Sequence, residues 1–76
     1  MDKPSYVAYL HEVVTALETS LTNSVNQGPR PGSEVHQEAL RRQLSIASGE
    51  LEDVLTSEEL TDCTARKEAL ALRLGS

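Results

Sequence analysis

The stretch Asn26-Gln27-Gly28-Pro29-Arg30-Pro31-Gly32-Ser33 decides the fold that we predict for this chain. It holds two prolines and two glycines within residues 28–32, and such a run cannot continue a helix or a central strand. An amphipathic helical pattern lies on each side of it. A helix, a sharp break and a second helix that can fold back predict a helical hairpin with its loop at 26–33.

The segment before the loop carries the strongest periodic signal. Its apolar residues recur at spacings of 3, 4, 3 and 4, which is typical of an amphipathic helix: Val7, Leu10, Val14, Leu17 and Leu21. Asp2 is placed to cap the helix, and Pro4 is tolerated in the first turn. We therefore predict a helix over about 3–25.

A second, narrower stripe follows the loop. It repeats at spacings of 4, 3, 4 and 3: Leu40, Leu44, Ala47, Leu51 and Val54. Ser33 is placed as the N-cap, so we predict a helix over about 34–55. Gly49 in its middle costs on the order of 1 kcal/mol against alanine and indicates a bend or a close contact with another backbone.

A capping box predicts a third helix over about 57–74. In Thr56-Ser57-Glu58-Glu59, Thr56 would be the N-cap and Glu59 the third helical residue. Leu55 and Leu60 stand at the positions of a hydrophobic staple around this box.

The apolar face of this third helix is less regular, because Lys67 interrupts it: Leu60, Cys63, Leu70 and Leu74. Gly75 is a natural C-cap. The predicted fold class is all-α. Residues 1–76 would form a single domain, an antiparallel helical hairpin plus a third C-terminal helix in a small helical bundle.

Composition limits the stability that the chain can reach alone. A chain of 76 residues buries only about 60% of the surface that its unfolded form exposes. Tyr6 and Tyr9 are the only aromatic residues, and a crude balance of burial against conformational entropy comes out near zero. We expect the missing stabilisation to come from another chain.

Several classes of function are disfavoured. The net charge of −5 argues against a generic nucleic-acid binder, and no run reaches the roughly 20 apolar residues of a membrane span. The single cysteine, Cys63, suits a reducing cytoplasm, where we place the protein. Together with His11 and His36 it makes neither a zinc site nor an evident nucleophile–base pair, so we expect no enzyme, no metal and no cofactor.

An acidic run occupies residues 50–62, which contain no basic residue: Glu50, Glu52, Asp53, Glu58, Glu59 and Asp62. It lacks the spacing and the central glycine of an EF-hand. Two interpretations remain open. The run is a solvated helix junction, or it is an acidic patch that meets a basic partner surface and steers its approach.

Two antiparallel helices cannot cover each other fully. One flank of each stripe stays exposed unless a third helix or a partner covers it. Tyrosine suits such an interface because it combines a large apolar body with a polar tip. The candidate partner-binding residues on this flank are Tyr6, Tyr9, Val13, Ile46 and Leu72.

From Tyr6 to Val54 the layout resembles the small YscE-type co-chaperones of bacterial type III secretion. The resemblance includes the start of the second helix at Ser33-Glu34-Val35-His36-Gln37 and its continuation from Ala39-Leu40 to Leu51-Glu52-Asp53-Val54. It implies a heterodimer with a helical-repeat co-chaperone. The pair would hold the amphipathic C-terminal helix of the needle subunit and prevent its premature polymerisation.

Two hypotheses for function follow. In the first, the chain is a small chaperone or adaptor that shields an amphipathic helix of a partner. In the second, it is a self-associating structural or regulatory oligomerisation module. The difference between a broad first stripe and a narrow second one favours a heterologous partner.

Overall fold

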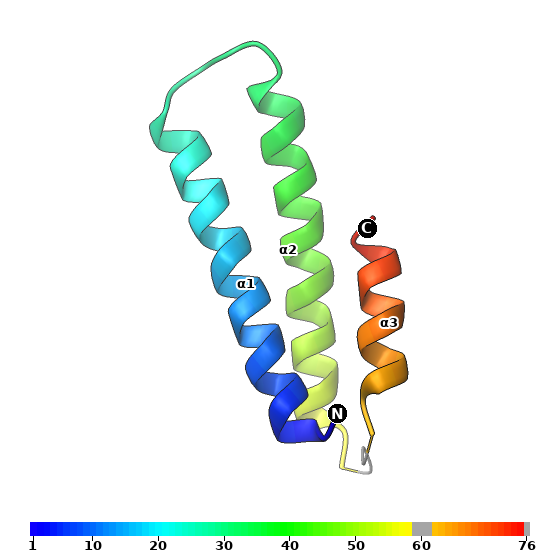
Figure 1. Ribbon diagram of the computed structural model, residues 1–76. Coiled ribbons are helices and arrows are strands. Elements are labelled where there is room, and N and C mark those ends of the chain that lie inside the picture. Colours follow the sequence, from blue (N-terminus) through cyan, green and yellow to red (C-terminus); the bar gives the residue numbers. More distant parts are fainter. Residues whose placement is uncertain (59–61, 76) are drawn as a thin grey trace.

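The computed structural model describes residues 1–58 and 62–75, and it is all-α in these ranges. Its helices are α1 (Lys3–Asn26), α2 (Ser33–Thr56) and α3 (Thr64–Arg73). The two long helices pack antiparallel, and α3 lies beside the half of α2 that is farther from the hairpin loop (Figure 1). The chain measures 45 × 19 × 16 Å. The predicted hairpin with a third C-terminal helix is confirmed.

Two glycines shape the hairpin loop. Gly28 and Gly32 have φ angles of 80° and 82°, in the left-handed region that disfavours residues with a Cβ atom. Gly32, and not Ser33 as predicted, is the N-cap of α2. Ser33 is already the first helical residue, and its Oγ accepts a hydrogen bond from the Arg30 N–H at 3.2 Å. The prediction failed because the glycine makes the turn into the helix.

At the start of α1 the predicted cap is confirmed. The Asp2 carboxylate accepts a hydrogen bond from the Ser5 N–H at 3.1 Å, and this interaction lowers the pKa of Asp2. Pro4 lies in the first turn, where its missing N–H leaves no helical hydrogen bond unmade.

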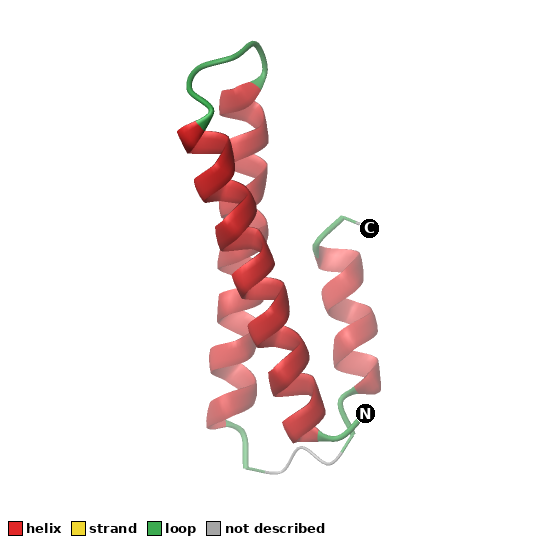
Figure 2. Cartoon of the chain, turned by 60° about the vertical axis from the view of Figure 1, so that its left-hand side comes forward, coloured by secondary structure: helices red, strands yellow, loops and turns green. Residues whose placement is uncertain are grey.

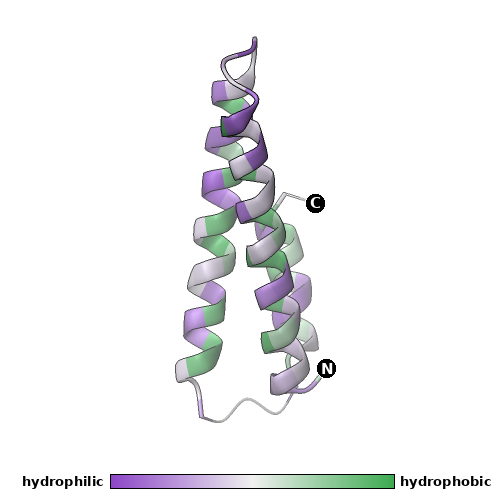
Figure 3. Cartoon of the chain, turned by 90° about the vertical axis from the view of Figure 1, so that its left-hand side faces the viewer, coloured by the Kyte–Doolittle hydropathy of each residue, from purple (hydrophilic) through white to green (hydrophobic). Residues whose placement is uncertain are grey.

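The core is concentrated at the end of the hairpin opposite the loop. Side chains from both long helices and from the α3 region form one fully buried cluster there: Tyr6, Leu10, Val54, Cys63 and Leu70. Toward the loop the stripe of α1 is only half-buried, and hydrophilic stretches prevail on both helices (Figure 3). Packing by three helices therefore holds one end of the molecule, and packing by two helices holds the other.

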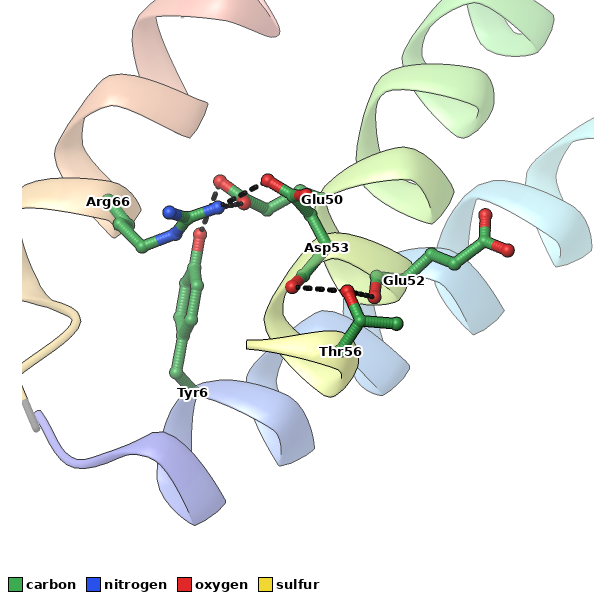
Figure 4. Close-up of polar contacts among 6 residues, drawn as sticks. All are labelled: Tyr6, Glu50, Glu52, Asp53, Thr56 and Arg66. Carbon is green, nitrogen blue, oxygen red and sulfur yellow. Dashed lines mark hydrogen bonds and ion pairs between the residues drawn. The ribbon is translucent and has the colours of Figure 1, made fainter. Parts of the chain in front are cut away.

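The third helix begins at Thr64, so the prediction that it begins at about Ser57 is wrong. Among the described residues, the Thr56 hydroxyl makes no hydrogen bond to a following helix. It donates back into α2, to the carbonyl oxygens of Asp53 at 3.0 Å and Glu52 at 3.1 Å (Figure 4). Ser57 then takes an extended conformation that ends α2. Glu59 and Leu60, the remaining parts of the predicted box and staple, lie outside the described residues.

Asp62 supplies the local signal for α3. Its carboxylate accepts hydrogen bonds from the N–H of Thr64 at 3.0 Å and from its hydroxyl at 2.8 Å. These bonds lower the pKa of Asp62 to about 2. Cys63, which lies between Asp62 and Thr64, occupies the N-cap position of α3. Its N–H donates to the carbonyl oxygen of Met1 at 2.7 Å. The start of α3 is thus tied to the segment that precedes α1.

The interpretation of Gly49 as a close contact with another backbone is wrong. Among the described residues, no atom outside the local helix backbone lies within 4 Å of a Cβ built on it. The position is exposed, and α2 continues unbroken from Ser33 to Thr56. The glycine therefore has a cost in helix propensity that no packing contact offsets.

Replacing Gly49 with alanine is expected to raise the free energy of unfolding by about 0.5–1 kcal/mol, because alanine restricts the unfolded chain and favours the helix. Urea denaturation followed by circular dichroism at the helical band measures this change. Gly32→Ala is the matched control. Its φ of 82° makes alanine strained there, so we expect a loss of about 1 kcal/mol. A Gly49→Ala variant no more stable than the parent would contradict this account.

Candidate functional site

A buried glutamate joins the three helices. Glu50 extends from α2 with only 6% of its side chain exposed. The Tyr6 hydroxyl of α1 donates to its Oε2 atom at 3.2 Å, and the Arg66 guanidinium of α3 donates to its Oε1 atom (Figure 4). A carboxylate removed from water is tolerated only with such partners. This polar triad connects both α1 and α3 to α2.

Arg66 bridges two carboxylates. Besides Glu50 it contacts the exposed Asp53, with 2.9 Å between Nη2 and Oδ2. The hydrogen bonds to Glu50 and Asp53 raise the pKa of Arg66. Its Nε atom is buried and has no hydrogen-bond partner within the described part of the chain. Arg66 is therefore the main polar contact of α3 with α2, and one of its donors remains unused.

Burial, together with the neighbouring charge of Glu50, raises the pKa of the Tyr6 hydroxyl above its ordinary value of 10.0. A phenol in this position donates to the carboxylate only while it is protonated. The neutral form of Tyr6 is thus part of the folded structure.

Lys67, which interrupts the apolar face of α3, has a specific contact. Its Nζ atom lies 4.7 Å from the centroid of the Tyr9 ring, a cation–π arrangement. Tyr9 in turn stacks on Tyr6, with 6.1 Å between ring centroids and 15° between ring planes. On either side of Lys67 in the sequence, Cys63 and Leu70 are fully buried, so their predicted place on the packing face is confirmed.

A groove of about 360 Å³ begins where α3 ends and follows α2 toward the loop. Gln43 marks its beginning, because its side-chain amide donates to the Leu74 carbonyl oxygen at 3.1 Å. The groove is lined by Val35, Glu38, Ala39, Arg42, Gln43, Ile46, Arg73, Leu74 and Gly75. It is the candidate site for a partner.

The short length of α3 explains why this groove is open. With 10 residues α3 is about 15 Å long, whereas α2 has 24 residues and is about 36 Å long. Figure 2 shows α3 beside only the half of the hairpin opposite the loop. Beyond the end of α3, Val35 is 73% exposed.

The predicted partner-binding residues lie in different environments. Tyr6 is fully buried, so the expectation that it lies on an uncovered flank is wrong: α3 covers that flank. Tyr9, Val13 and Ile46 are half-buried, and of these Ile46 lines the groove. Leu72 is 76% exposed. Whether these four residues bind a partner stays a prediction.

The acidic run divides into two parts. Glu50 and Asp53 meet Arg66 of the same chain, whereas the other described acids are exposed: Glu52, Glu58 and Asp62. Glu59 lies outside the described residues. Sequence reasoning missed the triad around Glu50. A signal was present, since Val35, Ala39, Ile46, Glu50 and Asp53 form a second row along α2 at helical spacing.

Within residues 1–58 and 62–75, no three His, Cys, Asp or Glu side chains are grouped so as to hold a metal ion. None of the helices in these ranges is apolar over a length sufficient to cross a membrane. No protein-family model, curated protein or solved structure matches the chain. Proposals about function accordingly rest on the triad and the groove.

Replacing Arg66 with alanine would leave Glu50 buried with Tyr6 as its remaining partner. Breaking a fully buried pair costs 3–5 kcal/mol; because Arg66 is 33% exposed, we expect a loss of about 2 kcal/mol in the free energy of unfolding. Arg73→Ala is the matched control, an exposed arginine of the same helix whose loss should cost less than about 0.5 kcal/mol. Urea denaturation compares the two variants, and equal losses would contradict the assigned role of Arg66.

The raised pKa of Tyr6 predicts a loss of stability in alkali. Below pH 10 the phenol is protonated in both the folded and unfolded chains, so its contribution is complete. As the pH rises further, the unfolded chain releases the proton first, and unfolding becomes more favourable. We therefore expect the free energy of unfolding to fall more steeply above about pH 10 in the parent than in Tyr6→Phe.

Denaturation series at several pH values provide this comparison. Tyr6→Phe should also be less stable by about 1 kcal/mol at neutral pH, since Glu50 loses a donor. Tyr9→Phe is the matched control and should keep the pH slope of the parent. Identical slopes for the parent and Tyr6→Phe would show that the phenol is not held in its neutral form.

Proposed function

We propose that this chain is a non-enzymatic protein-interaction module, a small chaperone or adaptor that shields an amphipathic helix of a partner. The observation that supports this most directly is the groove on α2. The groove continues the surface on which α3 already lies, so the chain itself provides an example of a helix bound there.

The apolar lining of the groove suits a helix. Val35, Ala39 and Ile46 follow one another along one side of α2 at intervals of about one or two helical turns. A partner helix with apolar residues at matching intervals would cover them, as in other helix-in-groove complexes. Burial of Val35 alone removes a largely exposed branched side chain from water.

The charged side chains around the groove would orient a bound partner helix. Arg42 and Arg73 border it from α2 and α3, and Glu38 is the only acid of the lining. An acidic residue on the partner helix would meet two guanidinium groups, which bind carboxylates with directed hydrogen bonds. The partner that fits is therefore an amphipathic helix with an acidic residue beside its apolar face.

The resemblance to YscE-type co-chaperones supplies a specific version of this proposal. The chain would work in the cytoplasm beside a helical-repeat co-chaperone, and the helix that they shield would be that of a type III secretion needle subunit. The buried, single Cys63 suits a reducing compartment. The groove supports the binding of a helix, and the secretion pathway rests on the resemblance alone.

Val35→Glu tests the groove directly. It places a charge at the exposed apolar position, next to Glu38, and should abolish stoichiometric co-purification of the partner from the native cell. Val25→Glu is the matched control, because Val25 is also exposed, at 52%, and does not line the groove. We expect Val25→Glu to retain the partner and both variants to keep the helical circular dichroism of the parent. Loss of the partner in both variants would place binding elsewhere.

Light scattering on the purified chain separates this proposal from self-association. A folded monomer agrees with a chaperone that waits for its partner. A stable homodimer at micromolar concentration would overturn the chaperone proposal in favour of an oligomerisation module.

A further inference from the structure

The side chains of Tyr6, Leu10, Glu50 and Val54 form the surface on which α3 lies, which we call the binding strip. We propose that α3 is a displaceable occupant of this strip, and that the partner helix takes its place by presenting a basic residue to Glu50 and Asp53. This inference rests on the proposed function and assigns the chemistry of the partner. The partner is an amphipathic helix with an arginine or lysine in register with Arg66 and leucines four and eight residues later, as Leu70 and Leu74 follow Arg66 in this chain.

The strip beneath α3 has an unusual chemistry. Its apolar floor consists of Tyr6, Leu10 and Val54, and Glu50 lies within it as a buried carboxylate. Without α3 this carboxylate would keep the Tyr6 hydroxyl and lose its cationic partner. A purely apolar or acidic helix would therefore bind the vacated strip poorly, because it would bury an uncompensated charge.

The attachment of α3 is limited. A helix of 10 residues is too short to persist alone in water, so α3 is helical only while it is docked. Its side-chain polar contacts with α2 come from a single residue, Arg66, among the described residues. We therefore expect α3 to open more readily than the two long helices of the hairpin, even though Leu70 contributes to the buried cluster.

A longer partner helix would have an advantage over α3. It could cover the strip beneath α3 and the groove beyond it, and so bury Val35 and Ala39 in addition. Its acidic residue near Arg42 would lie about two to three turns beyond its basic residue near Glu50, since these two positions of α2 are eight residues apart. The same surface thus distinguishes a partner helix from α3 by length and by the order of its charges.

Cys63 is a built-in reporter of this displacement. It is the only cysteine, and it is fully buried while α3 is docked. A thiol reagent will label it only when the α3 region lifts or the whole chain unfolds. The labelling rate on the full chain therefore measures the opening of α3.

The probe is a synthetic peptide with the sequence of residues 64–75, which contains Arg66, Leu70 and Leu74 and no cysteine. At about 2 mM, comparable with the effective concentration of a tethered segment, it should raise the labelling rate of Cys63 about twofold or more. The matched peptide carrying Arg66→Glu should leave the rate unchanged. Equal effects of the two peptides, or no effect of either, would overturn the inference.

Two variants of the full chain exclude global unfolding as the cause. Arg66→Glu repels Glu50 and Asp53 and should raise the labelling rate about tenfold without peptide, with α1 and α2 still helical. Leu44→Ala weakens the stripe of α2 away from α3 and should leave the rate within about twofold of the parent. Acceleration in proportion to overall destabilisation in both variants would show that α3 does not open separately.

The outcome is separable from that of the proposed function. If Val35→Glu abolishes partner binding but neither peptide alters labelling, the groove binds the partner while α3 stays in place. If the native peptide displaces α3 but Val35→Glu keeps the partner, the strip under α3 is a binding site and the groove beyond it is not.

Discussion

The carboxylate of Glu50 is the constraint around which the rest of the structure is arranged. Only 6% of the Glu50 side chain is exposed, so its carboxylate needs hydrogen-bond donors from the protein itself. Helix α1 supplies one donor through Tyr6, and α3 supplies another through Arg66. Each donor fixes the register of its helix against α2. The apolar core then gathers at the same end of the hairpin, where Leu10, Val54 and Leu70 are fully buried.

The two ends of the molecule differ as a consequence. Around Glu50 three helices exclude water, whereas near the loop the described residues pack only α1 against α2. There the stripe of α1 stays half-buried, although Leu40 of α2 is buried. The position of the groove follows from this difference. It begins beside Leu74, the residue after α3, and it is the first part of this side of α2 that the described residues leave uncovered.

Local signals were readable from the sequence, and contacts between distant segments were not. The glycines and prolines of the loop, the Asp2 cap and the apolar stripes act within a few residues, so they predicted the hairpin correctly. By its position in the sequence, the Thr56 hydroxyl can bond either to a helix that follows it or to carbonyl oxygens of the helix that precedes it. The structure shows the bonds to the preceding helix, at Glu52 and Asp53. The burial of Tyr6 depends on contacts with residues far away in the sequence, among them Glu50 and Leu70, and no local periodicity predicts such contacts. Of the candidate site, Ile46 was found because it departs from the main stripe.

The ion pair of Glu50 with Arg66 stands at a buried position that packed apolar side chains could also fill. Replacing a buried ion pair with packed apolar residues is often neutral or stabilising, so stability alone does not favour Glu50 and Arg66 here. In the function that we propose, what the pair would provide is selectivity between partner helices. An apolar strip would accept any amphipathic helix, including one from a misfolded chain, whereas a buried carboxylate rejects helices that bring no cation. The same feature keeps α3 in one register and limits how tightly it is held. In the function that we propose, the chain would cover its own apolar surface when empty and release that cover when a partner arrives, and an interaction that is specific and only moderately strong would suit this role.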